Sequence, residues 1–151
     1  MIEGARLRKL PVIPDERGFL MEIFRNDDPE FEAFGQVYMS VVFPGVVKGW
    51  HYHDEQTDHF CVVRGMAKVV LYDRREDSPT RGEVNEFFLG DRNPALLTIP
   101  RLVLHGMKGI GVEPAYLINI PDRPYRRENP DEQRISPHDA QVPYDWSRKD
   151  G

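Results

Sequence analysis

Three of the five histidines, His51, His53 and His59, lie within residues 45–65 of the chain. The residues that flank them are apolar and β-branched, which is typical of strands. Successive side chains of a strand point to opposite faces, so His51 and His53 share one face. A polar run follows and predicts a turn, and the apolar residues 60–63 predict the returning strand. We therefore expect a β-hairpin that presents two imidazoles to the space enclosed by a sheet.

The spacing of these histidines also suits a metal site. Asp58 follows in the turn of the hairpin, and His105 lies on a later segment. Three imidazoles and one carboxylate make a ligand set for a divalent first-row metal. The spacing resembles the two-part signature of cupins, small β-barrel proteins, although Leu102 stands where the second part usually has glycine. A divalent metal held by His51, His53, Asp58 and His105 is one alternative for this site.

The elements that must position these residues are short. Thirteen prolines and twelve glycines divide the chain, and apolar runs separated by turn residues recur roughly every 8–12 residues. This pattern predicts an all-β fold, and we favour a cupin jelly-roll β-barrel formed by residues 1–151 as a single domain. Residues 29–34 are expected to add a short helical segment, and the tail from Pro121 to wrap over the barrel. The expected strands are 6–13, 19–25, 36–43, 50–53, 60–63, 66–72, 83–89, 95–99, 102–107 and 115–120.

Composition excludes several classes of partner. The net charge is −5, and acidic and basic residues are interspersed without a lysine or arginine run. Nucleic acid and an anionic membrane surface are therefore not expected as partners. The N-terminus lacks the apolar run of a signal peptide, and no apolar stretch of 18 residues occurs. The single cysteine, Cys61, cannot form an internal disulfide, so we expect a cytoplasmic protein.

Five segments, in order along nearly the whole chain, resemble the dTDP-4-dehydrorhamnose 3,5-epimerase family, nucleotide-sugar enzymes on a cupin barrel. Residues 15–22 resemble its D-x-R-G-x-F-x-E stretch, and Lys48 to His51 resemble its R-G-L-H stretch. Residues 62–65 follow at the expected distance. Residues 100–106 resemble P-x-G-x-x-H-G, and residues 132–139 match E-x-G-I-x-W-N-D in length. The resemblance implies an epimerase that inverts C3, C5 or both in a nucleotide-linked 4-keto-6-deoxy sugar, without a cofactor.

The resemblance also implies catalytic roles. His51 stands at the position of the general base, Asp139 at that of its carboxylate partner, and Tyr116 at that of the general acid on the opposite face of the sugar. A neutral imidazole has a reference pKa of about 6.5 and accepts a proton near neutral pH. A carboxylate behind it fixes the tautomer and stabilises the imidazolium.

Substrate contacts are expected from Arg17, Glu22, Lys48, His105 and Tyr125. In similar proteins the segment that holds Arg17 and Glu22 crosses to a neighbouring subunit, so we expect a homodimer. Lys48 replaces the arginine of the family and cannot make the same bidentate contact.

Asp58 replaces a family lysine, which reverses a charge beside the sugar. Two alternatives to the epimerase therefore stay open. One is a metal-dependent cupin enzyme of isomerase or dioxygenase type, and the other is a non-catalytic sugar-binding barrel. Asp139 favours the metal-free epimerase, because a metal cupin does not need it, whereas Asp58 favours the metal site.

Overall fold

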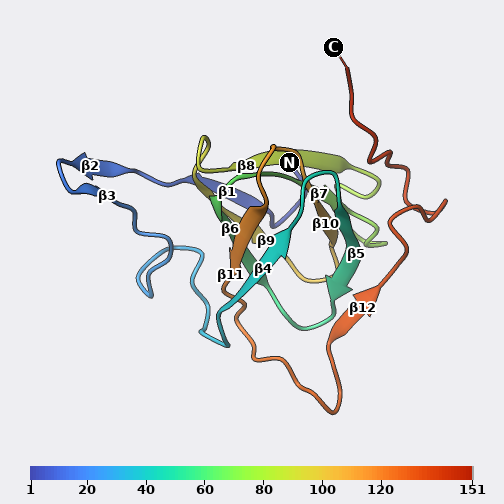
Figure 1. Cartoon of the computed structure of the whole chain (residues 1–151). Coiled ribbons are helices and arrows are strands. Elements are labelled where there is room, and N and C mark those ends of the chain that lie inside the picture. The colour runs from blue at the N-terminus through green and yellow to red at the C-terminus, as the bar shows by residue number, and fades with distance from the viewer. Residues whose placement is uncertain (151) are drawn as a thin grey trace.

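The computed structural model describes residues 1–150 and consists of two five-stranded antiparallel sheets that face each other (Figure 1). The first sheet has the order β1 (Arg6–Lys9), β9 (Ala95–Ile99), β6 (Asp58–Arg64), β11 (Ala115–Asn119), β4 (Tyr38–Val42). The second has the order β12 (Glu132–Arg134), β5 (Val47–His53), β10 (Leu104–Gly109), β7 (Met66–Tyr72), β8 (Val84–Gly90). The strands β2 (Ile13–Asp15) and β3 (Gly18–Leu20) form a separate hairpin that projects from the sheets. The all-β prediction is confirmed.

The core lies between the sheets. Side chains alternate between the two faces of each strand, so every second side chain is buried there. On β7, Val69 and Leu71 enter this core, whereas Val70 faces outward. The same alternation on β5 turns Trp50 outward and His51 inward. The expected hairpin is wrong, because β5 pairs with β10 and β12 whereas β6 pairs with β9 and β11 in the opposite sheet. Strand β5 still presents His51 and His53 to the interior.

Both outer sheet faces are covered by segments without regular structure. On the second sheet, Trp50 packs against Val142 and Trp146 of the C-terminal tail. On the first sheet, Cys61 packs against residues 21–24. The tail therefore wraps the sheet as predicted, and it also contributes β12, a strand that the sequence analysis missed.

The predicted short helical segment is wrong. Residues 29–34 form only a turn, in which Phe31 N donates to Asp28 O at 3.0 Å. Gly35 N then donates to Pro121 O at 2.9 Å, so the backbone pairs with a distant segment instead of with itself. A single helical turn fixes three residues for one hydrogen bond, which makes so short a helix unfavourable. Residues 1–150 contain no helix long and apolar enough to cross a membrane.

Candidate active site

A cavity of about 890 Å³ opens between the two sheets. Its walls come from β4 and β11 on one side and from β5 and β12 on the other, and Phe60, Met107 and Leu117 supply apolar surface. This volume lies in the range of pockets that hold small-molecule ligands. The polar lining residues are Gln36, Tyr38, Ser40, Lys48, His51, His53, Gln56, Tyr125, Glu132, Arg134 and Ser136.

Three histidines gather at one wall of the cavity. His51 and His53 come from β5, and His105 comes from the neighbouring strand β10, where it pairs directly with His51. The His51 and His105 rings meet edge to face, with centroids 4.1 Å apart. One ring nitrogen of each histidine lies within 4.8 Å of the other two. Between His105 and Met107 the pairing has an irregularity, in which β5 has one more residue than β10. The predicted convergence of the three imidazoles is present.

Asp58 supplies the carboxylate of this cluster. Its Oδ2 lies 3.3 Å from Nε2 of His53 and 3.3 Å from Nε2 of His105. Its Oδ1 accepts hydrogen bonds from the side-chain amides of Gln56 and Asn119, both at 2.7 Å. Burial alone raises the pKa of Asp58, but these imidazoles and amides outweigh burial and hold that pKa well below its usual range. Asp58 is therefore a buried anion with four polar neighbours.

The surroundings of His51 favour its neutral form. Burial lowers the pKa of His51 well below its usual value, and the nearby His105 imidazole lowers it further. Asp58 acts in the opposite direction, because its negative charge stabilises an imidazolium. His51 lines the cavity, so a neutral base faces the space that a ligand would occupy.

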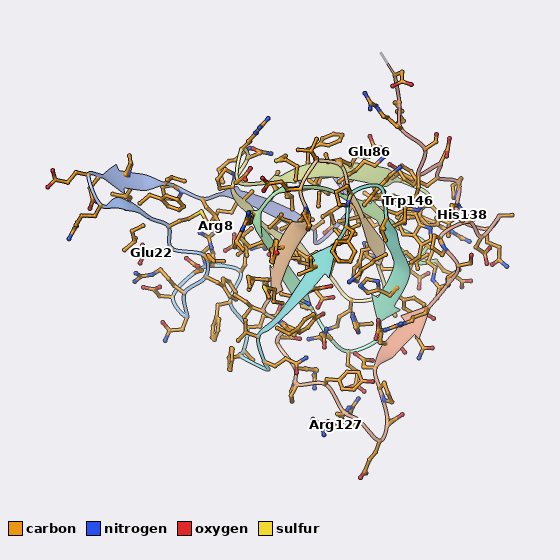
Figure 2. All side chains as sticks on the ribbon, viewed as in Figure 1. Arg8, Glu22, Glu86, Arg127, His138 and Trp146 are labelled. Carbon is orange, nitrogen blue, oxygen red and sulfur yellow. The ribbon has the colours of Figure 1, made fainter. Side chains whose placement is uncertain are left out.

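Asp139 does not reach His51 in this structure. Its Oδ1 accepts the backbone N–H of Gln141 at 2.8 Å, which closes a local turn in the C-terminal tail. The tail leaves the cavity after Ser136, and Val142 then packs on the outer face of the second sheet. Figure 2 shows His138, the neighbour of Asp139, at the periphery of the molecule. The carboxylate among the histidines is Asp58 instead.

Tyr116 also lies outside the cavity. Strand β11 buries Leu117 toward the interior, so its neighbour Tyr116 points to the outer face. There the guanidinium of Arg64 lies 5.7 Å from the centre of the Tyr116 ring. The tyrosines that line the cavity are Tyr38 and Tyr125.

The expected substrate contacts divide into two groups. Lys48 and Tyr125 line the cavity, and Lys48 Nζ donates to Ser40 Oγ at 3.0 Å. His105 is buried behind His51. Arg17 lies in the turn of the projecting hairpin and Glu22 just after it, on the side of the molecule where this hairpin extends away from the sheets (Figures 1 and 2).

On that hairpin each of the two residues has a partner of its own. Arg17 pairs with Asp15 at 2.6 Å, and Glu22 pairs with Arg25 at 3.0 Å. The chain therefore does not bring Arg17 and Glu22 to its own cavity.

The polar residues of the site that the sequence analysis missed include Tyr38, Gln56, Asn119 and Arg134. Arg134 pairs with His51 in register across β12 and β5, and its guanidinium contacts Glu132 at 3.0 Å. Asn119 occupies the same face of β11 as Leu117, and this two-residue spacing was the only signal available for it. Burial raises the pKa of Tyr38 to about 12, so its phenol stays protonated across the neutral range.

Comparison with known families identifies the family of this chain. The model of the dTDP-4-dehydrorhamnose 3,5-epimerase family matches residues 1–151. The chain belongs to this family. It is therefore an enzyme of the nucleotide-sugar 3,5-epimerase type, and the resemblance drawn from the sequence is confirmed.

Relatives within the epimerase family match almost the full length. The probable low-salt glycan biosynthesis epimerase Agl13 of Haloferax volcanii is 46% identical over 148 residues, or 97% of this chain and 95% of that protein. The spore coat polysaccharide biosynthesis protein SpsL of Bacillus subtilis is 42% identical over 147 residues, or 97% of each. The crystal structure of a dTDP sugar isomerase from Desulfovibrio desulfuricans G20 superposes with a TM-score of 0.90 and 40% identity, covering 99% of this chain and 94% of that one. The chain thus shares its fold with a dTDP sugar isomerase, and it has relatives that are named for glycan and polysaccharide biosynthesis.

Proposed function

We propose that this enzyme inverts C3, C5 or both in a nucleotide-linked 4-keto-6-deoxy sugar, with His51 as the general base. The observation that carries the proposal is a neutral imidazole at the wall of a cavity of about 890 Å³. His51 takes the proton from the carbon beside the ketone. The electron pair of the broken C–H bond is delocalised onto the ketone oxygen, which gives an enolate. A proton returned to the opposite face then gives the inverted centre. A positioned base of this kind contributes roughly 10²–10⁴-fold.

The walls of the cavity offer cations for the negative charges of this substrate. Lys48 extends from β5 beside His51, and its ammonium group is a candidate partner for the enolate oxygen. Arg134 lies on the adjacent strand β12 and is a candidate partner for the diphosphate. Fixed cations stabilise developing charge most strongly where water is excluded.

In this proposal Asp58, and not Asp139, is the carboxylate that stabilises the protonated form of His51. It acts through His105 instead of bonding to His51 directly. It contacts His105 at 3.3 Å, and the His105 ring in turn lies against His51. Its charge favours the imidazolium that forms when His51 accepts a proton. Asp58 is therefore a positioning and electrostatic residue rather than a direct partner of the base.

A metal-dependent cupin enzyme is the second candidate, because the histidine cluster fits a divalent ion. The three ring nitrogens lie within 4.8 Å of one another, and the buried atoms His105 Nε2 and His53 Nδ1 lack well-directed hydrogen bonds. His51, His53 and His105 would hold the ion, with Asp58 beside them. Such an ion polarises a keto oxygen as a Lewis acid. His51 would then be a ligand and not a free base.

Exchange of substrate protons in D₂O separates these candidates. We expect the enzyme to exchange the C3 or C5 proton of a dTDP-linked 4-keto-6-deoxy-hexose, with no stoichiometric metal by elemental analysis and no effect of EDTA. His51→Ala should lose exchange by roughly 10²–10⁴-fold. One metal per chain whose removal abolishes exchange would establish the second candidate. Absence of exchange with every 4-keto sugar tested would leave a sugar-binding protein.

We also propose a homodimer in the cytoplasm. The projecting hairpin exposes Phe19 (69%) and Leu20 (58%), and its Arg17 and Glu22 are far from their own cavity. A two-fold partner would cover this apolar surface and receive these polar residues at its own site. The buried free thiol of Cys61 accords with a reducing compartment. Light scattering at micromolar concentration tests the assembly, and a monomeric mass would contradict it.

A further inference from the structure

Inversion of a carbon needs a proton donor on the wall of the cavity that faces the base. His51 belongs to β5 in the second sheet, so the donor must come from the first sheet. In that sheet Tyr38 on β4 lines the same cavity. Tyr116 faces away from the cavity, as described above. The remaining candidates for the proton donor are the tyrosines that line the cavity, Tyr38 and Tyr125.

Asn119 fixes the direction of the Tyr38 hydroxyl. The Asn119 side chain is fully buried, and its Oδ1 accepts the backbone N–H of His59 at 3.1 Å. Because a backbone N–H can only donate, this contact assigns the oxygen and the nitrogen of the amide. The amide nitrogen then donates to Tyr38 Oη at 2.9 Å and to Asp58 Oδ1 at 2.7 Å. Tyr38 is thus the acceptor toward Asn119, and its own O–H proton is free for another partner.

We propose that Tyr38 is the proton donor to the face of the enolate opposite His51. This proposal rests on the proposed epimerase function. The Tyr38 O–H bond breaks, a C–H bond forms at the enolate carbon, and the enolate oxygen returns to a ketone. Tyr38 is 41% exposed, so its oxygen recovers a proton from water, and His51 releases its proton to solvent. The step needs no cofactor and no redox partner.

Asp58 connects the two walls. Its carboxylate accepts a hydrogen bond from the Asn119 amide, which also donates to Tyr38. The same carboxylate contacts His105, whose ring lies against the His51 ring. Tyr38 and Asn119 are paired residues on adjacent strands, so this connection is fixed by the register of the first sheet. Tyr125 also lines the cavity, but it is 53% exposed and lies in the loop after Pro121, outside the strands that hold the base and Asn119. The geometry therefore favours Tyr38 over Tyr125 as the donor.

Tyr38→Phe tests the proposal in D₂O with the dTDP-linked 4-keto-6-deoxy-hexose as probe. The variant should incorporate deuterium at the epimerised carbon within about threefold of the wild-type rate, since His51 remains. Inversion of that carbon should fall at least about 100-fold, at the lower end of general-acid contributions. Tyr72→Phe is the matched control, because Tyr72 packs on the outer side of the second sheet and lies outside the cavity.

Each other result overturns the assignment of Tyr38. Retention of inversion in Tyr38→Phe would show that the donor is another group, and separation of exchange from inversion by Tyr116→Phe would return that role to Tyr116. Loss of both exchange and inversion with an unchanged melting temperature would show that Tyr38 serves binding. Failure of the wild-type enzyme to exchange any proton is a different result, because it refutes the proposed function itself.

Discussion

Two buried aspartates of this enzyme illustrate the difference between a structural carboxylate and one placed for chemistry. Asp73 is fully buried at the end of β7. Its carboxylate accepts hydrogen bonds from Arg75 Nη2 at 2.8 Å, from Ser78 Oγ at 2.5 Å and from Thr80 Oγ1 at 2.7 Å. All three partners lie within seven residues along the chain. Asp73 therefore ties one loop to itself.

Asp58 is buried to the same degree, but its neighbours come from distant elements. Asn119 belongs to β11, His53 to β5 and His105 to β10, and only Gln56 is near in sequence. Two of these neighbours are imidazoles, whose ring nitrogens can donate or accept protons. In both cases hydrogen bonds outweigh burial and keep the pKa of the carboxylate well below its usual range. Burial and a lowered pKa thus do not distinguish the two aspartates, whereas the origin and chemistry of their neighbours do.

Asp58→Asn should have the largest effect in this comparison. The change removes the charge that favours protonation of His51 and places an amide against two imidazoles. We expect epimerisation to slow by roughly 10²–10³-fold, less than the ~10⁴-fold of a directly bonded His–Asp pair, because Asp58 acts through His105. Steady-state rates with the 4-keto sugar measure this loss. A rate within threefold of wild type would contradict the role given to Asp58.

Asp73→Asn should affect stability and leave the rate per folded molecule unchanged. The amide cannot accept the hydrogen bonds of Arg75, Ser78 and Thr80 together, and the half-buried guanidinium of Arg75 loses its counter-charge. We expect the free energy of unfolding to fall by about 2–3 kcal/mol. Urea unfolding measures it, and kcat at a temperature where the variant is folded serves as the control. A rate loss comparable to that of Asp58→Asn would end the distinction between the two sites.

The smallest effect is expected in the acid range. The folded-state pKa of Asp73 lies well below the usual aspartate value of about 3.9. Its contribution to stability is therefore complete above about pH 5 and is lost as pH falls toward the folded-state value. Wild-type protein should therefore lose stability more steeply than Asp73→Asn between roughly pH 5 and pH 2. Urea midpoints across this range measure the difference. Parallel curves would show that Asp73 gains nothing from its partners on folding.

The residues by themselves determined the local arrangement of the site. Alternation along a strand is a property of the backbone, so the shared face of His51 and His53 followed from their spacing alone. The same holds for the all-β class, whereas the expected hairpin is wrong because β5 and β6 belong to different sheets. The order of the five family segments also carried the enzyme class, since it depends only on residue types and distances along the chain. His105 was assigned to the same site on that basis, and β10 places it there.

Only the tertiary structure decided which carboxylate lies among the histidines and which tyrosines line the cavity. Strand β11 carries apolar side chains on both of its faces. Its sequence therefore does not reveal that Leu117 and Asn119 face inward and that Tyr116 faces outward. A shift of one residue reverses every side chain of a strand, and β11 has an irregular register against β6 at this point. Asp139 was misplaced because the tail crosses from the cavity to the outer sheet face within a few residues. Pairing between segments far apart in the chain, which no local pattern encodes, brought Tyr38, Asn119 and Asp58 together instead.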